Sequence, residues 1–333
     1  FLSPDRPLLI DEYLGNAIEL DVDAVCDGEE VLVGAIMEHL EEAGIHSGDS
    51  TCFIPPQNIS EGVLSKVREW TTTIGLELGI RGCFNIQFAI RDEELYVLEV
   101  NPRGSRTFPF VAKATGVPLA RIAARVALGE KLSSLDIPKP QTEAVSVKAP
   151  VFPFIKLRGL DPAPGPEMKS TGEVMGSHVR PAAAYLKARM ATELPVPTSG
   201  GVYITVKDED KSGTIELAKR LQDMGFKIHA TPGTASALRE IGSLEVETCY
   251  RIEERKSPDA LDLMRKGMIQ LVINTPTATG GAVLDGNMMR RLAVELNIPF
   301  VTTMAGAKME VEAIAEMQLG TPEPRLLDIS TLN

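Results

Sequence analysis

A strand-like segment in the first half of the chain carries the residues best suited to binding a metal ion. Residues 83–103 read CFNIQFAIRDEELYVLEVNPR, two runs in which polar and apolar residues alternate on either side of RDEE. If Arg91 pairs with Leu95 across a three-residue loop, Gln87 lies opposite Glu99 in an antiparallel hairpin. The two-residue period of a strand then places one polar set on a single face: Asn85, Gln87, Glu99, Asn101 and Arg103.

The residue types on this polar face favour binding of a divalent cation that is itself bound to a phosphate group. A carboxylate and two amides supply the oxygen ligands that Mg²⁺ prefers, and phosphate and water complete its octahedron. Arg103 follows Asn101 closely enough to hold a phosphoryl oxygen. The alternative is a solvated sheet face, but Asn-Pro at a strand end is unfavourable unless the position is used. The other face of the hairpin is predicted to be core: Phe84, Ile86, Phe88, Tyr96, Leu98 and Val100.

The elements around this hairpin are also readable from the sequence. Residues 17–40 alternate on both sides of Asp27-Gly28, which predicts a hairpin with a tight two-residue turn. Ser60 is a plausible N-cap for a helix. A further helix begins near Pro118 and ends near Gly129. The apolar positions of the two helices are, respectively, Val63, Val67, Trp70, Ile74 and Leu78, and Leu119, Ile122, Val126 and Ala127.

The remainder of the chain changes character twice. Between residues 131 and 197 prolines accumulate and periodicity fades, so we expect a linker or an irregular wrap. The last third alternates short apolar runs with amphipathic segments of helix length, which predicts a parallel sheet with helices on both faces. The predicted strands lie at 201–207, 226–230, 246–251, 270–275 and 299–304. Ligands of such sheets bind beyond the carboxyl ends of the strands.

Composition excludes several classes of protein. The net charge of −12 disfavours nucleic acid as a partner, and no apolar run approaches the roughly 18 residues of a membrane-spanning helix. The four cysteines are widely spaced without a CxxC motif, which indicates reduced structural thiols rather than disulfides or a zinc site. We therefore expect a cytoplasmic protein. Phe1 in place of an initiator methionine suggests a piece of a longer chain.

Several motifs together resemble one family. The stretch LYVLEVNPRGSRTFPFVAKATGVPLARIAARVALGEKL, with EHLEEAGIHSGDS and GPEMKSTGEVMG, is similar to the carbamoyl-phosphate synthetase large subunit in its second ATP-grasp domain. The resemblance implies two domains of mixed α/β and α+β class. Residues 1–197 would form a partial ATP-grasp domain, an antiparallel sheet with helices and a truncated lid. Residues 198–333 would form a doubly wound, methylglyoxal-synthase-like allosteric domain.

The resemblance assigns roles in an ATP site. Arg103 and Arg106 are implied to face phosphate or carbamate. The metal ion, Mg²⁺ or Mn²⁺, would be held by Gln87, Glu99 and Asn101. The remaining nucleotide contacts are implied at Leu14 for the adenine, at Glu19 for the ribose, and at the loop residues Gly44, Ile45, His46 and Ser47.

The family's reaction is phosphorylation of carbamate by ATP to give carbamoyl phosphate, for pyrimidine and arginine biosynthesis. Such phosphoryl transfer relies on positioning and charge neutralisation. The implied partners are a small glutamine-hydrolysing subunit and the N-terminal half of the large subunit, with homo-oligomerisation left open. Because the motifs begin after the family's glycine-rich loop, residues 1–333 are expected to make no carbamoyl phosphate at a meaningful rate alone.

The last third resembles the family's regulatory domain. ATPGTA, residues 230–235, follows a predicted strand and opens a helix, so its N–H groups can meet an anion. The resemblance implies a nucleotide effector, UMP first and IMP second. Pro276 stands where well-known members have Thr. The implied effector contacts are Lys211, Thr231, Thr234, Arg251 and Asn274.

Other interpretations remain open. Ornithine-activated members carry Glu after SVK, whereas this chain has Ala149, so little ornithine activation is expected although Glu41 and Asp49 match that pocket. A methylglyoxal synthase-type lyase could explain the last third, but no acid follows Gly280-Gly281 directly. The third alternative is a stand-alone nucleotide-binding regulatory module.

Overall fold

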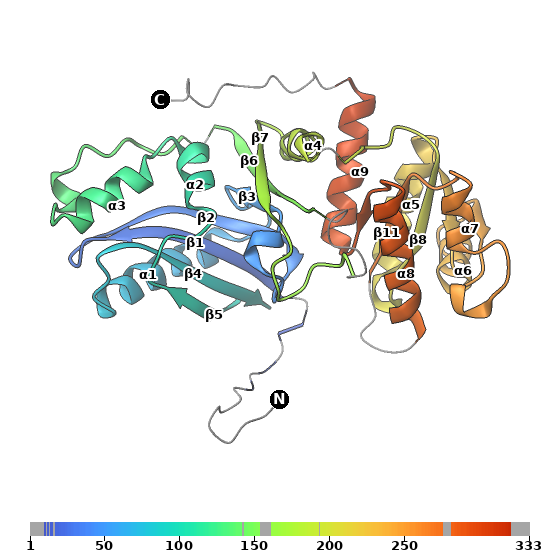
Figure 1. Ribbon diagram of the computed structural model, residues 1–333, viewed down its shortest axis with the longest axis horizontal. Helices are drawn as coiled ribbons and strands as arrows, with labels where there is room; N and C mark the ends of the chain where they lie inside the picture. The colour runs from blue at the N-terminus through green and yellow to red at the C-terminus, as the bar shows by residue number, and fades with distance from the viewer. Residues whose placement is uncertain are drawn as a thin grey trace.

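The chain forms two sheets of different type, side by side along the long axis of the molecule (Figure 1). The computed structural model describes residues 10, 12, 14–15, 17–141, 143–153, 161–192, 194–275 and 281–320, with the side chains of 281 and 282 excepted. Within this part of the chain no helix is long and apolar enough to cross a membrane.

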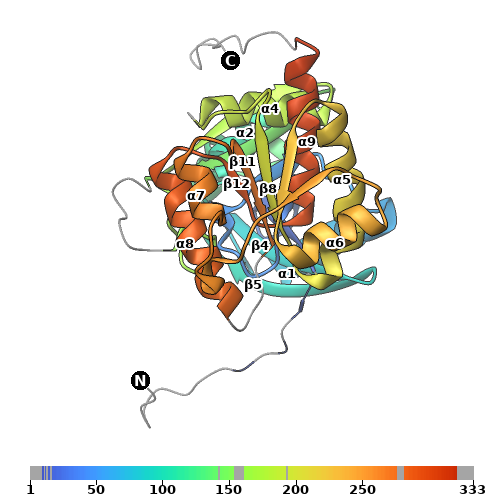
Figure 2. The ribbon, with the colours of Figure 1, turned by 90° about the vertical axis from the view of Figure 1, so that its right-hand side faces the viewer.

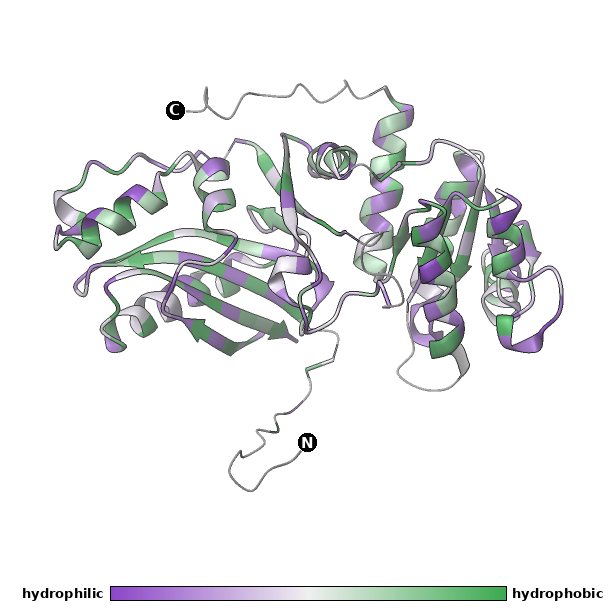
Figure 3. Ribbon diagram, in the orientation of Figure 1, coloured by the Kyte–Doolittle hydropathy of each residue, from purple (hydrophilic) through white to green (hydrophobic). Residues whose placement is uncertain are grey.

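The first sheet is antiparallel throughout, in the order β5-β4-β1-β2-β3-β6-β7. Polar and apolar residues alternate along much of β1, β4 and β6, so these strands have a more hydrophilic and a more hydrophobic side (Figure 3). Its strands are β1 (Ile18–Cys26), β2 (Val31–Glu42), β3 (Cys52–Ile54), β4 (Gly82–Arg91), β5 (Glu94–Asn101), β6 (Val145–Val151) and β7 (Gly172–His178).

The first predicted hairpin is confirmed as β1 and β2. Its turn lies one residue later than predicted, because the Asp27 N–H donates to Glu30 O (3.1 Å) and Gly28 and Glu29 form the bend. Gly28 has φ +88°, which glycine adopts without strain. The Asp27 carboxylate accepts from the N–H groups of Glu29, Glu30 and Leu132. The turn therefore anchors the chain beyond residue 130 as well as the two strands.

The second predicted hairpin is β4 and β5, and the predicted pairing of Gln87 with Glu99 is confirmed. The predicted three-residue loop is wrong. Arg91 pairs with Glu94 around a two-residue turn in which Asp92 and Glu93 both have positive φ. A bulge restores the register, since Gln87 pairs with Glu99 but Phe88 pairs with Val97.

Because of this bulge, the residues of β5 that face the core differ from the predicted ones. Leu98 is the extra residue and is 42% exposed, and Tyr96 lies opposite Ala89 and is only half-buried. Leu95 is buried in place of Tyr96. On β4 the prediction holds, because Phe84, Ile86 and Phe88 are fully buried.

Helix α1 (Glu61–Glu77) covers the apolar face of β1, β2 and β4, and the Ser60 side chain caps it as predicted by accepting from Val63 N. The predicted stripe drifts off the buried face, since Trp70 is 37% and Leu78 62% exposed. Thr71 and Gly75 are buried instead, because the helical period of 3.6 residues brings them over the sheet.

Two helices cover part of the other face, where Val25, Met37 and Cys52 pack against them. These are α2 (Phe108–Thr115) and α3 (Leu119–Ala127). The helix predicted from Pro118 to near Gly129 is confirmed, although Ala123 is buried and the predicted Ala127 is exposed. Together α2 and α3 leave the remaining part of this face to polar residues of β1 and β4.

The prediction of a linker or irregular wrap between residues 131 and 197 is wrong in its centre. Strands β6 and β7 extend the first sheet, and α4 (Pro181–Ala191) packs on them. Prolines hid these elements because Pro150 lies inside β6 and Pro181 is the first residue of α4, where proline is tolerated. A side chain at Gly176 would lie 2.2 Å from Ala184 O, so glycine permits the close approach of α4.

The second sheet is parallel, in the order β10-β9-β8-β11-β12, as predicted from the alternation of apolar runs and helices. Helices α5, α6 and α9 cover one face, and α7 and α8 cover the other (Figure 2). The elements are β8 (Gly201–Thr205), α5 (Lys211–Asp223), β9 (Lys227–Ala230), α6 (Pro232–Glu240), β10 (Val246–Thr248), α7 (Ala260–Arg265), β11 (Leu271–Asn274), α8 (Gly281–Glu295), β12 (Phe300–Val301) and α9 (Met304–Gln318).

Helices α4 and α9 join the two sheets through a buried polar contact. Glu310 of α9 is fully buried and accepts from Tyr185 Oη (2.8 Å) and from Arg189 Nε (3.1 Å) of α4. Ala313 of α9 lies in one apolar cluster with Phe53 and α4 residues. The sheets therefore share a packed contact, and the predicted domain boundary after residue 197 stays a prediction.

We expect Glu310→Ala to lower the free energy of unfolding by about 3 kcal/mol, because it leaves the Arg189 guanidinium buried without its partner. Urea denaturation followed by circular dichroism measures the change. The control is Glu130→Ala, which removes a solvent-exposed partner of Arg125 and should leave the midpoint unchanged. Equal midpoints for the two variants would contradict the expected role of the α4–α9 contact.

Candidate functional site

Three carboxylates follow one another along β1 on the sheet face that α1 does not cover. Glu19, Asp21 and Asp23 are each at most 1% exposed. The register pairs Asp21 with Gln87 and Asp23 with Asn85, so this carboxylate row lies on the same face as the polar residues of β4. The polar face of the hairpin is therefore continuous with a buried acidic strip.

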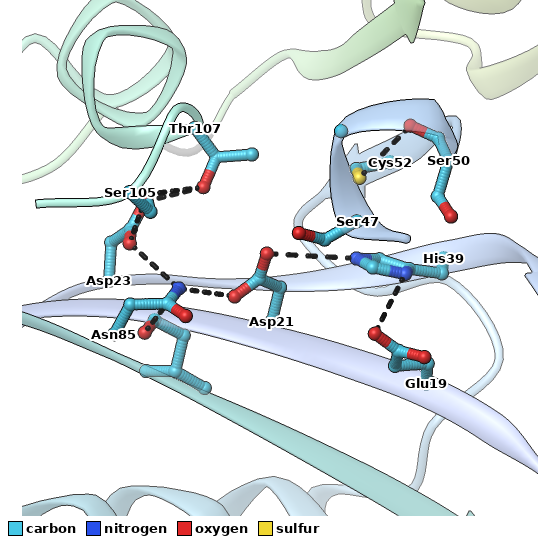
Figure 4. Close-up of polar contacts among 12 residues, drawn as sticks. Glu19, Asp21, Asp23, His39, Ser47, Ser50, Cys52, Asn85, Ser105 and Thr107 are labelled. Atoms are coloured by element: carbon cyan, nitrogen blue, oxygen red, sulfur yellow. Dashed lines mark hydrogen bonds and ion pairs between the residues drawn. The ribbon is translucent and has the colours of Figure 1, made fainter. Parts of the chain in front are cut away.

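At the Asp23 end of the carboxylate row, both carboxylate oxygens accept hydrogen bonds (Figure 4). Asp23 accepts from Ser105 Oγ (2.6 Å) and Thr107 Oγ1 (2.7 Å), which precede α2. The Asn85 amide donates to Asp23 (3.0 Å) and also to Asp21. One amide thus bridges two neighbouring carboxyl groups and fixes their separation.

Burial changes the protonation of the row. It raises the pKa of Asp21 to about 8 and that of Glu19 to about 7, and it also raises the pKa of Asp23. Near neutral pH the row therefore holds protons that exposed carboxylates would have lost. A protonated carboxyl group can donate a hydrogen bond, which a carboxylate cannot.

His39 of β2 lies beside the row. Its Nδ1 is 3.5 Å from Glu19 Oε1, and its Nε2 is 3.9 Å from Asp21 Oδ2. Burial and the nearby Lys148 lower the pKa of His39 to about 3, so the imidazole is neutral and these are polar contacts rather than ion pairs. Within the described residues both ring nitrogens, Glu19 Oε1, Asp21 Oδ2 and Ser50 Oγ lack a hydrogen-bond partner.

A buried lysine connects this face to the loop above it. Lys148 of β6 is fully buried, and its Nζ donates to Ser47 O (2.8 Å). Ser47 begins a 3-10 turn, residues 47–49, that lies over the row (Figure 4). The positive charge of Lys148 lowers the pKa of Asp21 and Asp23, opposing part of the effect of burial. Lys148 thus positions the turn over the carboxylate row.

The predicted metal ligands lie together on the exposed side of the same face. Gln87 is paired with Glu99, and Asn101 Nδ2 donates to Glu99 Oε1 (2.7 Å). Arg103 Nη2 donates to Asn101 Oδ1 (3.5 Å). One carboxylate and two amide oxygens form a set that fits Mg²⁺ or Mn²⁺ bound to a nucleotide. Arg106 is exposed. Burial raises the pKa of Glu173 on β7, at the opposite edge of the sheet, and the positive charge of Arg106 offsets part of that rise.

The loop predicted to contact the nucleotide lies beside Glu19. Gly44 N donates to Glu19 Oε2 (3.1 Å), and Ile45 is half-buried. The His46 side chain accepts from Gly48 N (3.0 Å), a local capping contact. Leu14, which is predicted to contact the adenine, is half-buried. Residues 13 and 16, close to it in sequence, lie outside the described residues.

A second candidate site is a crevice of about 370 Å³ at the carboxyl ends of β8, β9 and β11. All five residues predicted to bind the effector line it: Lys211, Thr231, Thr234, Arg251 and Asn274. The five residues thus lie together at the strand ends, and their role in binding a ligand stays a prediction. Pro276 lies outside the described residues.

The crevice is built to receive an anion. Thr231 precedes α6 without a side-chain cap, so the first N–H groups of the helix remain without intrahelical partners. Thr231 and Thr234 place hydroxyl groups 3.3 Å apart at this helix start. Lys211 Nζ, paired with Asp208 (2.6 Å), lies so near the helix start that a Cβ at Gly233 would be 3.3 Å from it. A phosphate would meet hydroxyl, backbone and ammonium donors together.

Comparisons with known proteins match both parts of the chain. Residues 3–135 match the family model "Carbamoyl-phosphate synthase L chain, ATP binding domain", and residues 213–302 match "MGS-like domain". A carbamoyl phosphate synthase large chain from Methanosarcina barkeri is 46% identical over 322 residues, covering 96% of this chain and 80% of that protein. The chain belongs to the carbamoyl phosphate synthase large chain family.

Other members are longer. The large chain of Methanothermobacter thermautotrophicus is 47% identical over 98% of this chain, which spans 31% of it. The "large chain, C-terminal section" of Methanocaldococcus jannaschii is 46% identical over 96% of this chain, which spans 53% of it. A biotin carboxylase domain of a single-chain bacterial carboxylase has a TM-score of 0.37 and 18% identity over 42% of this chain and 34% of that one, too low to carry an argument.

Family membership fits the fold, a partial ATP-grasp sheet followed by a methylglyoxal-synthase-like domain. The roles of individual residues stay predictions. The two carboxylates matched to the ornithine pocket already accept backbone N–H groups, Glu41 from Thr51 (2.6 Å) and Asp49 from Lys169 and Ser170 (2.8 Å each). Ala149 is buried in the α4 cluster. The expectation of little ornithine activation in this carbamoyl phosphate synthase relative stays a prediction.

Sequence reasoning missed four residues of the two candidate sites. Asp21 and Asp23 were visible in the period-two pattern ELDVD, which repeats the alternation of the hairpin beside it. Lys148 had no signal beyond its place in SVKA, because its burial depends on strands far apart in sequence. Arg290, which contacts Asn274, lies in a helix whose pattern gives no reason to single it out.

The raised pKa values set the pH dependence of stability. The folded chain keeps the Asp21 proton to about pH 8, whereas the unfolded chain loses it near pH 4, so the free energy of unfolding falls between these values. Asp21→Asn mimics the protonated group and should not lose stability in this way. We expect the free energy of unfolding of Asp21→Asn, measured relative to that of the unmodified chain, to rise by at least about 1 kcal/mol from pH 5 to pH 8. Urea denaturation at both pH values measures this gain.

Asp92→Asn in the exposed β4–β5 turn is the matched control, and its free energy of unfolding should fall with pH as that of the unmodified chain does. Parallel pH profiles for Asp21→Asn and the unmodified chain would show that Asp21 is ionised in the folded protein at neutral pH.

Proposed function

We propose that this chain is the carbamate-phosphorylating and regulatory part of a carbamoyl phosphate synthase, an ATP-dependent ligase. The observation that carries the proposal is the pairing of Gln87 with Glu99 and of Asn85 with Asn101 on one sheet face, next to the buried carboxylate row. The match of residues 3–135 to an ATP-binding domain supports the nucleotide. The glutamine-hydrolysing subunit and the N-terminal part of the large chain are the proposed partners.

In the proposed reaction a carbamate oxygen forms a bond to the γ-phosphorus of ATP. The bond from that phosphorus to the β–γ bridging oxygen breaks, and ADP leaves. Gln87, Glu99 and Asn101 would hold Mg²⁺ or Mn²⁺, which neutralises phosphate charge when bound. Arg103 and Arg106 would add positive charge where the transferred group passes.

The chain's other residues shape the nucleotide site. Glu19 would accept the ribose hydroxyl groups while its Oε2 keeps the loop at Gly44 in place. Lys148 holds Ser47 O, and so fixes the turn that would lie against the nucleotide. No nucleophilic side chain is needed, since ATP and carbamate react directly and the protein contributes orientation and electrostatics.

We further propose that the strand-end crevice binds a nucleotide monophosphate effector, UMP first and IMP second. The converging donors of Thr231, Thr234 and Lys211 support a phosphate at the start of α6. The lyase alternative is not proposed, because Ala282 rather than an acid follows Gly280-Gly281.

We expect Glu99→Gln to lower the rate of carbamoyl phosphate synthesis roughly 100-fold, because it removes the charged oxygen that would hold the metal ion. The assay uses this chain assembled with the N-terminal part of the large chain and the small subunit. It follows carbamoyl phosphate formation with saturating bicarbonate, ammonia and ATP. The control is Glu94→Gln, the same substitution at the other end of β5, which should retain full activity. Equal rates for both variants would refute the proposed metal site.

We expect Lys211→Met to weaken UMP binding at least about tenfold in isothermal titration calorimetry, because the ammonium lies beside the start of α6. Lys219→Met, two turns along the same helix and exposed, is the control and should bind as the unmodified chain does. Unchanged affinity for UMP and IMP in Lys211→Met would place the phosphate elsewhere.

A further inference from the structure

One arginine connects the crevice of the second sheet to a segment of the first. Arg290 of α8 has a side chain only 4% exposed. Its Nε and Nη2 donate to the two carboxylate oxygens of Asp161 (2.9 and 2.6 Å), and its Nη1 donates to Asn274 Oδ1 (2.6 Å). All three nitrogens of the guanidinium are therefore used, and lysine could not reproduce this planar arrangement.

The crevice end of this contact belongs to the effector site. Asn274 ends β11, lines the crevice, and donates through Nδ2 to Thr205 O (3.3 Å) at the end of β8. Gly286, one helical turn before Arg290, leaves room for the contact, since a Cβ there would lie 2.8 Å from Arg290 Nη1. A ligand that hydrogen-bonds Asn274 must therefore share that amide with Arg290.

The other end belongs to a segment that covers the ATP-grasp side, residues 161–170. Lys169 Nζ donates to Asp161 O (3.0 Å), which ties the start of the segment to its end. At that end Lys169 N and Ser170 N donate to the two oxygens of Asp49 (2.8 Å each). His46 N donates to Gly165 O (2.9 Å). The segment thus holds residues 46–49, the turn proposed to contact ATP.

We propose that the Arg290–Asp161 ion pair transmits effector binding from the crevice to the turn at residues 46–49. The inference rests on the proposed effector function of the crevice and names its route of regulation. Nucleotide binding changes the hydrogen bonding of Asn274, Arg290 responds because Asn274 is one of its two partners, and Asp161 carries the change into residues 161–170. By thermodynamic linkage, a nucleotide bound at the turn changes the affinity for the effector by the same factor as the effector changes the affinity for that nucleotide.

A comparison with the α4–α9 contact shows why the Arg290–Asp161 contact is the one expected to move. On the other side of the interface, α4 and α9 meet through a fully buried apolar cluster and the Glu310 contact. Asp161, in contrast, has a side chain 30% exposed and contacts α8 through Arg290. A packed apolar core is stiff, whereas the contact on the α8 side is a single ion pair whose Asp161 member is partly exposed, so the α8 side is where displacement is expected.

Hydrogen exchange measured by mass spectrometry tests the proposal on the 333-residue chain, with UMP and IMP as separate probes. For the unmodified chain we expect nucleotide to slow exchange at 231–235 and to change it at least about twofold at 46–50 and 161–170. For Asp161→Ala we expect the protection at 231–235 to remain, which shows a folded crevice, and the change at 46–50 to disappear. Arg290→Lys should show the same loss, with weaker nucleotide binding because it also contacts Asn274.

The matched control is Arg180→Ala, which removes an ion pair with Glu316 on the α4–α9 side and should keep the full response at 46–50. A response at 46–50 that survives in Asp161→Ala would overturn the inference and leave the effector site standing. Failure of both nucleotides to protect 231–235 in the unmodified chain would overturn the effector function and the inference together.

Discussion

The burial of three carboxyl groups on one inner strand is the constraint on which the first sheet depends. Removing Glu19, Asp21 and Asp23 from water costs free energy that the structure offsets in three ways. Asn85, Ser105 and Thr107 donate hydrogen bonds, Lys148 supplies a buried positive charge, and protons remain bound at neutral pH. These requirements fix where α2 begins, where β6 lies and how the turn at residues 47–49 is held.

The same constraint separates the two halves of the polar face. Toward β1 the oxygens are buried and partly protonated, whereas toward β5 Glu99 is exposed and Asn101 half-buried. A metal ion carried in on a nucleotide would meet ionised oxygen at the exposed edge and neutral groups behind it. The buried half therefore shapes the site without competing for the cation.

The sequence predicted the elements whose signals are local. Ser60 caps its helix, the alternating runs form both hairpins, and the five residues predicted to bind an effector lie together at the strand ends of the last third. The pairing of Gln87 with Glu99 was correct although its assumed loop was not, because the bulge at Leu98 compensates for the shorter turn. Strand β6 was missed because it contains Pro150 and pairs with β3, more than ninety residues before it, as in Cys52 with Lys148, and β7 depends on β6 as its partner. The protonation of Asp21 and the contact of Arg290 with Asp161 depend on burial and on residues distant in sequence, which no local pattern encodes.

The shared packing of α4 and α9 also bears on how such a chain can be divided. Cutting the polypeptide between the two sheets would leave Glu310 and the apolar side of α9 facing solvent, and would expose the side of α4 that α9 contacts. Each piece would then expose an apolar patch with an unpaired charge at its centre, a combination that promotes aggregation. If the second sheet and its helices were produced alone, α9 would need polar substitutions before this piece could stay in solution.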